Sequence, residues 1–156
     1  MTSGAVVFGI GNEDRGDDGV GPAVARALRE LAVPGLRVVA PAQPLDLLDH
    51  ELAAETVVVV DAVCSGRVPG SVLVLDVQRR PLPRWATSGS SHDFGLDAVV
   101  ELLGALGRRP RRLFLVAVEA GTFDPGAPLS VPVRAAVPAA VDAVLTLTGL
   151  QIRGER

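Results

Sequence analysis

TVVVVDA, residues 56–62, is the most apolar of the strand-like segments in this chain. Five of its seven residues are β-branched, a composition typical of strands. The run is apolar at consecutive positions, without the alternation of a strand that has one face in water. We therefore expect it to be buried on both faces, in the middle of a mostly parallel sheet. Asp61 comes at the end of this strand.

Outward from this strand, short β-branched runs alternate with helical patterns along the whole chain. Strands are predicted at residues 5–9, 36–40, 56–62, 70–77 and 112–120, and helices at residues 21–31, 45–53, 92–107 and 131–147. This alternation is typical of units in which helices cover both faces of a mostly parallel sheet. The sequence therefore predicts an α/β sandwich, as a single domain spanning residues 1–156.

Three features depart from the regular alternation. The strand at 70–77 begins only eight residues after the preceding strand, and a helical crossover needs a dozen or more. We therefore expect it to run antiparallel to that strand or to lie at the sheet edge. The loop at 79–91 is the longest, and such loops are usually functional or mobile. Pro138 should kink or split the last helix.

The composition excludes several classes of protein. A chain of 156 residues suits one domain that buries about 70% of the surface its unfolded chain exposes. No apolar stretch reaches the roughly 18 residues of a membrane span, and the N-terminus lacks the pattern of a signal peptide. The net charge of −3 argues against general nucleic-acid binding, and the single cysteine fits a reducing compartment. We expect a cytoplasmic monomer that binds neither nucleic acid nor membrane.

GIGNEDRGDDGVG, residues 9–21, combines five glycines with five charged residues, four of which are carboxylates. A phosphate cradle is disfavoured, because the third glycine of a GxGxxG pattern is missing and the carboxylates would repel a pyrophosphate. A helix cap is a simpler interpretation, since carboxylates accept hydrogen bonds from the free N–H groups of a helix start. One aspartate suffices for a cap, so one of Asp17 and Asp18 can point elsewhere.

A crevice between the first and third strands is the expected binding site. In doubly wound sheets, ligands bind beyond the carboxyl ends of the strands, where the winding direction reverses. If the strand order begins 2-1-3, Asp18 and Asp61 face this crevice. A turn or capping role is the alternative for Asp61.

His92 can complete a set of metal ligands. The long loop would bring its imidazole over the crevice, where Asp18 and Asp61 supply two oxygen ligands. Two oxygens and one nitrogen suit a divalent transition metal with coordination positions left open. The alternative is a surface histidine at a helix start, with Ser90 or Ser91 as the cap.

The other reactive side chains have simpler interpretations. Cys64 with a histidine could form a nucleophile pair, but a lone cysteine is more often a small buried hydrophobe. His50 is expected to be a solvated surface residue. The serines of residues 88–91 lack the G-x-S-x-G pattern of a nucleophile. The arginine cluster RRPRR, residues 108–112, is expected to be a solvated loop that can contact an acidic partner.

Four blocks, in order, resemble the hydrogenase maturation proteases, which trim the C-terminal extension from the large subunit of nickel–iron hydrogenases. GIGNEDRGDDGVG is similar to the opening signature of that family. The other three blocks are VVVVDAVCSGRVPGSV (57–72), SSHDFGLDAVVELL (90–103) and GAPLSVPVRAAVPAAV (126–141). The resemblance covers nearly the whole chain, and four ordered blocks are more specific than any one of them.

The resemblance implies a three-layer α/β/α sandwich with a mixed five-stranded sheet, in which one strand is antiparallel. It also implies that Asp18, Asp61 and His92 match the metal-contacting and catalytic positions of the family. There the metal is nickel already inserted in the large-subunit precursor, so no tightly bound cofactor of the enzyme itself is expected. On this interpretation Asp17 caps the helix, and Asp18 contacts the metal from a solvent-facing crevice.

Two positions depart from the family pattern. Asp14 replaces a more usual apolar residue, which predicts a more exposed loop, and Gln43 stands where some relatives carry an acidic residue. The alternative function is a non-catalytic, nickel-dependent docking factor for the same large subunit. The same three ligands would serve both functions.

Overall fold

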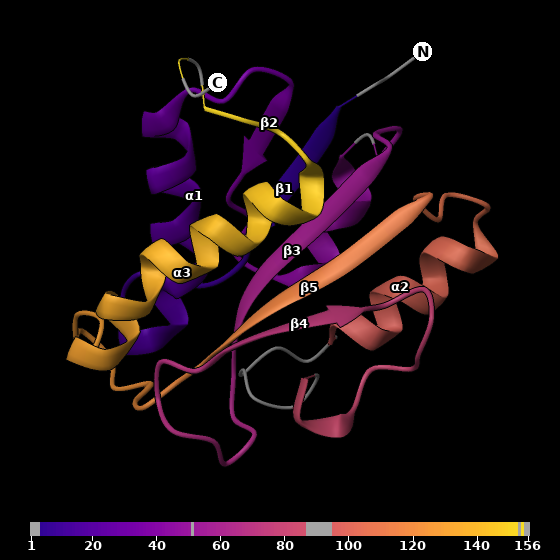
Figure 1. Ribbon diagram of the computed structural model, residues 1–156. Helices are drawn as coiled ribbons and strands as arrows, with labels where there is room; N and C mark the ends of the chain where they lie inside the picture. The colour runs from indigo at the N-terminus through magenta and orange to yellow at the C-terminus, as the bar shows by residue number, and fades with distance from the viewer. Residues whose placement is uncertain (1–3, 51, 87–94, 153, 155–156) are drawn as a thin grey trace.

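The fold is built on one five-stranded sheet (Figure 1). The computed structural model describes residues 4–50, 52–86, 95–152 and 154. Its strands are β1 (Ala5–Gly9), β2 (Leu36–Val39), β3 (Thr56–Val63), β4 (Val72–Asp76) and β5 (Arg112–Glu119), in the order β2-β1-β3-β5-β4. The first four strands in this order are parallel, and β4 pairs antiparallel with β5. This confirms the predicted mixed sheet.

The position of β3 follows from its apolar composition. All eight of its residues are buried, as the run at 56–62 predicts. Val57 and Val59 pack into the core on one face of the sheet, and Val58 and Val60 pack into the core on the other. Burying a valine side chain contributes about 1.5 kcal/mol or more to folding, so both faces stabilise the central position of β3.

Helices cover both faces of the sheet (Figure 1). On one face lie α1 (Val20–Leu31) and α3 (Val131–Thr148). On the other lie α2 (Leu96–Ala105) and the short 3-10 helix η2 (Pro44–Asp49). These three layers confirm the predicted α/β/α sandwich.

The strand β4 lies at the edge of the sheet, as the short connection from β3 predicts. The chain turns back at Gly70, whose φ is +89° and whose position allows no side chain. A Cβ there would lie 2.5 Å from the carbonyl oxygen of Pro132 at the start of α3. The turn before β4 is therefore packed directly against α3.

The structure differs from the sequence-based predictions at three helices. The helix predicted at 45–53 is the short η2, which starts with Pro44 and ends before His50, whose backbone is extended. Only two of its residues are buried, too few to anchor a longer helix on the sheet. The helix predicted from residue 92 begins, within the described residues, at Leu96. Pro138 does not split α3, which continues as one helix to Thr148.

The helix α3 also passes a test for membrane spans by length and composition, with a mean hydropathy of 1.4. The prediction that no apolar stretch is long enough to span a membrane is therefore wrong for this helix. The helix nevertheless buries one side in the core against the sheet and α1, through Val133, Ala136, Ala140, Val141 and Val144. A core helix of a globular protein passes the same test, so α3 is a packing element of the sandwich.

Candidate active site

The chain turns sharply between β1 and α1, at the carboxyl edge of the sheet. A short 3-10 turn, η1 (Gly16–Gly19), precedes α1. Gly11 has a φ of +143°, and a Cβ there would lie 1.8 Å from the carbonyl oxygen of Asp18. Only glycine permits so close an approach. This approach brings η1 back over the end of β1.

Asp18 lies in η1 and is buried, with 3% of its surface exposed. Its Oδ2 accepts a hydrogen bond from the backbone N–H of Asn12 at 2.9 Å. Its Oδ1 is buried and has no hydrogen-bond partner among the described residues. A buried carboxylate oxygen without a donor costs free energy, which a cation would offset. The expectation of a solvent-facing Asp18 is wrong, because η1 packs closely on Gly11 and leaves Asp18 buried.

Asp61 is the second buried carboxylate of this edge, with 5% of its surface exposed. Burial raises the pKa of Asp61 well above its usual range, and the charge of Asp18 raises it further. A hydrogen bond from the Ala62 N–H to Oδ1, at 2.9 Å, opposes this shift of the pKa. Asp18 and Asp61 therefore repel each other electrostatically at this edge of the sheet.

The order β2-β1-β3 places this site where the sequence predicts it. The N–H of Ile10, just after β1, donates to the carbonyl of Val60 in β3 at 2.9 Å, so Asp61 stands beside the exit of β1. The third predicted ligand, His92, lies outside the described residues. Within the described ranges, no group of three histidine, cysteine or acidic side chains is arranged to hold a metal ion. The structure thus brings two of the three predicted residues together, and the ligand set stays a prediction.

Asp17 was expected to cap the helix that follows it, but it does not. Neither η1 nor α1 has a side-chain hydrogen bond at its cap. The fully buried Asp17 carboxylate instead accepts hydrogen bonds from the N–H groups of Gly121, Thr122 and Ser130 and from the Ser130 hydroxyl, at 2.7–3.0 Å. Asp17 therefore holds the connection between β5 and α3 against η1.

Glu119, at the end of β5, is a structural residue that the sequence analysis missed. It is 3% exposed, and its carboxylate accepts hydrogen bonds from the N–H groups of Ser65 and Gly66 and from the Ser65 hydroxyl, at 2.6–3.1 Å. It thereby anchors the loop that leaves β3. An acidic residue at the end of a buried strand, as at Asp61, was the available signal.

Two other sequence expectations are wrong. Cys64 is exposed rather than buried, since it begins the loop that leaves β3. Partial burial raises the pKa of its thiol and the charge of Glu119 raises it further, which disfavours the thiolate that a nucleophile needs. His50 is half-buried rather than solvated, because its ring lies 5.5 Å from that of Phe8.

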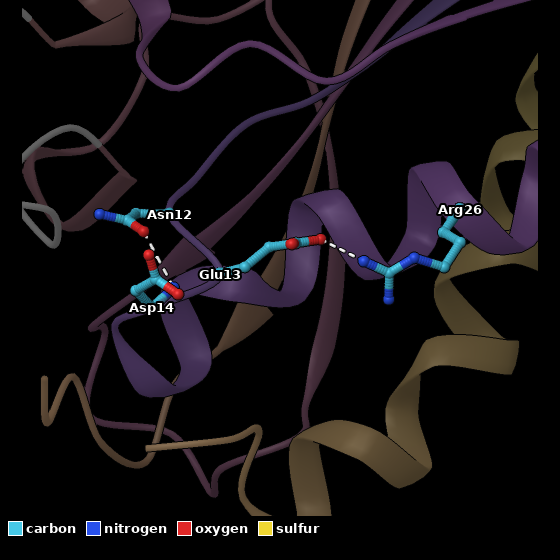
Figure 2. Close-up of polar contacts among 4 residues, drawn as sticks. All are labelled: Asn12, Glu13, Asp14 and Arg26. Atoms are coloured by element: carbon cyan, nitrogen blue, oxygen red, sulfur yellow. Dashed lines mark hydrogen bonds and ion pairs between the residues drawn. The ribbon is translucent and has the colours of Figure 1, made fainter. Parts of the chain in front are cut away.

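The exposed rim of the site is formed by the residues that follow Gly11 (Figure 2). The Asn12 Oδ1 accepts a hydrogen bond from the Asp14 N–H at 2.9 Å, and Glu13 forms an ion pair with Arg26 of α1. Asp14 is exposed, as its departure from the family pattern predicted. Gln43 is also exposed, and its side-chain amide donates to the Asp46 carboxylate at 3.5 Å. The role of Gln43 stays open.

Comparisons with known proteins show the family of the chain. A family model described as hydrogenase maturation protease matches residues 23–147. The hydrogenase expression/formation protein HupD of Rhizobium leguminosarum bv. viciae is 30% identical over 88% of this chain and 70% of its own length. HupM of Azotobacter chroococcum is 34% identical over 83% of this chain and 64% of its own length.

Solved structures show the same fold. An endopeptidase from Escherichia coli superposes with a TM-score of 0.81, at 25% identity over 92% of this chain and 91% of that one. A hydrogenase 2 maturation peptidase from a Thaumarchaeota archaeon has a TM-score of 0.65, at 30% identity over 96% and 100% of the two chains. The family model covers most of the chain, including Asp61. The chain therefore belongs to the hydrogenase maturation proteases, a family of endopeptidases.

Proposed function

We propose that this maturation endopeptidase removes the C-terminal extension of a nickel–iron hydrogenase large-subunit precursor after nickel insertion. Family membership supports the reaction and the substrate class. We further propose that Asp18, Asp61 and His92 contact the nickel of the precursor. The observation that carries this proposal is the buried Asp18 Oδ1, which has no donor among the described residues and lies in one site with Asp61.

The two carboxylates suit a metal that arrives with the substrate. Carboxylate oxygens and an imidazole nitrogen are accepted ligands of divalent transition metals. A cation next to Asp18 Oδ1 would satisfy this oxygen and reduce the repulsion between Asp18 and Asp61. The nickel would supply positive charge near the scissile carbonyl. A resident cofactor of the enzyme is not required.

The residues of the chain can also assist the proton transfers of hydrolysis. Burial and the charge of Asp18 raise the pKa of Asp61, so its carboxylate is a stronger proton acceptor than an ordinary aspartate. Asp61 is therefore our candidate for the base that takes a proton from the attacking water. Asp18 keeps its orientation through the Asn12 N–H.

We place this reaction in the cytoplasm, carried out by a monomer. The single cysteine supports a reducing compartment. A docking factor that does not cut its partner would use the same residues, but membership of a protease family favours the enzyme.

The test is a processing assay with nickel-loaded and nickel-free precursor, in which mass spectrometry detects the released peptide. Wild-type enzyme should cut only the nickel-loaded form, and Asp18→Ala and His92→Ala should cut neither form. Asp14→Ala, in the exposed rim, is the matched control and should retain activity. Equal cleavage of both precursor forms, or full cleavage by Asp18→Ala, would contradict the contact with nickel. Binding of the precursor without any cleavage would favour the docking factor.

A further inference from the structure

We propose that the side-chain amide of Asn12 donates a hydrogen bond to the oxygen of the scissile carbonyl. This inference rests on the proposed cleavage at the Asp18–Asp61 site. Attack on a peptide bond places negative charge on the carbonyl oxygen, and preorganised donors stabilise that charge. Ionised carboxylates only accept hydrogen bonds. A hydrogen-bond donor besides the two aspartates would therefore add to the stabilisation of this charge.

The orientation of the Asn12 side chain is fixed by a hydrogen bond to its own loop. Its Oδ1 accepts a hydrogen bond from the Asp14 N–H at 2.9 Å. The oxygen end of the amide therefore faces the loop. The amide nitrogen points away from Asp14 (Figure 2). Asn12 is exposed, and in the part of the chain that the structure describes no acceptor takes a hydrogen bond from its Nδ2. Both N–H groups of this nitrogen are thus available to a substrate.

Four backbone donors near the two aspartates are already used. The N–H of Ile10 donates to the Val60 carbonyl at 2.9 Å, and the N–H of Gly11 donates to the Pro41 carbonyl at 3.3 Å. The N–H of Asn12 donates to Asp18 Oδ2. On the β3 side of the site, the N–H of Ala62 donates to Asp61 Oδ1. Along residues 10–12, the Asn12 side chain is therefore the donor that remains for the substrate.

The backbone that carries Asn12 is held on both sides, as preorganisation requires. Its own N–H is bonded to the Asp18 carboxylate, so the side chain of Asn12 starts within one residue of that group. Before it, Gly11 packs so closely on the carbonyl of Asp18 that no side chain fits. After it, a Cβ on Gly19 would lie 3.2 Å from the Cα of Glu13. The amide is thus positioned by contacts that form without substrate.

Asn12 takes no part in the proton balance of the reaction. Water supplies the oxygen that bonds to the carbonyl carbon, the C–N bond breaks, and the amine leaves with a proton that originates from that water. The Asn12 amide keeps both of its protons throughout. Its contribution is a hydrogen bond that strengthens as the carbonyl oxygen becomes negative, which lowers the barrier without tighter binding of the precursor.

The test compares Asn12→Ala and Asn12→Asp with wild type on nickel-loaded precursor. Asn12→Asp keeps an oxygen for the Asp14 N–H but lacks the donor, and Asn12→Ala lacks both without adding charge. We expect kcat to fall about 100-fold in both variants with little change in KM, the effect typical of a lost oxyanion donor. Asp142→Ala, at an exposed position of α3 outside the site, is the control and should keep wild-type kcat. The melting temperature and the cadmium affinity of Asn12→Ala should equal those of wild type.

Other outcomes would overturn the assignment of Asn12. A wild-type kcat in Asn12→Ala would show that the amide is not used. A raised KM with unchanged kcat would indicate binding of the ground state, and a loss confined to Asn12→Asp would be an effect of added charge. Weaker cadmium binding by Asn12→Ala would show that the side chain acts by positioning Asp18. Failure of the wild-type enzyme to cut would instead overturn the proposed function, and the Asn12 assignment with it.

Discussion

Three acidic residues near the carboxyl edge of the sheet differ in how far their oxygens are satisfied. Asp17 and Glu119 each receive several hydrogen bonds from loops distant in sequence. Asp18 is equally buried, but one of its oxygens has no donor within the described ranges. Full satisfaction is typical of a structural carboxylate, whereas an unsatisfied buried oxygen is a cost that function can explain. On this basis we assign Asp17 and Glu119 to the scaffold, and the role of Asp18 in the chemistry stays our proposal.

We predict that Asp17→Ala lowers the free energy of unfolding by about 3 kcal/mol, because it leaves four donors without their charged acceptor. Urea denaturation measures this change. Asp14→Ala, at an exposed position three residues away, is the control and should stay within about 0.5 kcal/mol of wild type. A loss below about 1 kcal/mol would mean that the loop between β5 and α3 does not depend on Asp17.

The raised pKa of Asp61 predicts how stability changes with pH. Because the folded state favours protonated Asp61, the stabilising effect of that proton is present at acid pH and is lost as pH rises through the raised pKa. Asp61→Asn removes the ionisation. The variant should therefore be more stable than wild type near pH 7, by about 1.4 kcal/mol for each unit of the pKa shift, with the difference vanishing near pH 4. Thermal melts of both proteins from pH 4 to pH 8 measure this, and a difference independent of pH would refute it.

For single residues, the sequence predicted that Asp18 and Asp61 lie at the same edge of the sheet, but it did not predict the contacts of every acidic residue there. Asp18 and Asp61 could be paired because the order 2-1-3 puts the ends of β1 and β3 side by side. The role of Asp17 could not be predicted, because its donors lie more than 100 residues away along the chain. The burial of Asp18 was missed for a similar reason, since it depends on how η1 folds over Gly11.

At the scale of elements, periodicity predicted the strands better than the short helices. The strand β3 was identified because consecutive β-branched residues are buried on both faces. The segment at 45–53 has helical spacing, but its structure is the short η2. Helical spacing alone does not supply the tertiary contacts that a short helix needs to persist. The edge position of β4 was predicted from the length of the β3–β4 connection alone, since this connection is too short for a crossover.

Substitution of Gly11, in the turn after β1, and of Gly104, in α2, by alanine should change stability in opposite directions. In Gly11→Ala the Cβ would overlap the Asp18 carbonyl, so the turn must move and the Asp18 carboxylate with it. We expect loss of most cleavage activity together with lower stability. In α2, a Cβ on Gly104 meets nothing within 4 Å, so Gly104→Ala should raise stability by up to about 1 kcal/mol and leave cleavage unchanged. Activity assays and urea denaturation of both variants test this, and a fully active Gly11→Ala would contradict the proposed geometry.

For the whole molecule, stability and chemistry are placed in different regions. Two apolar cores, one on each face of the sheet, hold the layers together. The carboxylates Asp18 and Asp61 lie instead at the ends of parallel strands, where loops from separate parts of the chain meet. This separation lets the edge keep a repulsive pair of acids, and an oxygen that has no donor among the described residues, without unfolding the protein.

Metal ions should change the stability of the whole chain. Since the three proposed ligands come from separate segments of the sequence, which must be ordered when an ion binds, we expect the free protein to bind cadmium, nickel or zinc only modestly and to be purified largely without metal. An ion that binds the folded state alone stabilises it by mass action, by about 2.7 kcal/mol at 100 times the dissociation constant. Added cadmium should therefore raise the melting temperature of wild type and of Asp14→Ala, but not of Asp18→Ala or His92→Ala. Zinc that remains stoichiometric after dialysis against a chelator would contradict this, since a resident zinc ion would make the protein an ordinary zinc hydrolase rather than an enzyme that responds to the nickel of its substrate.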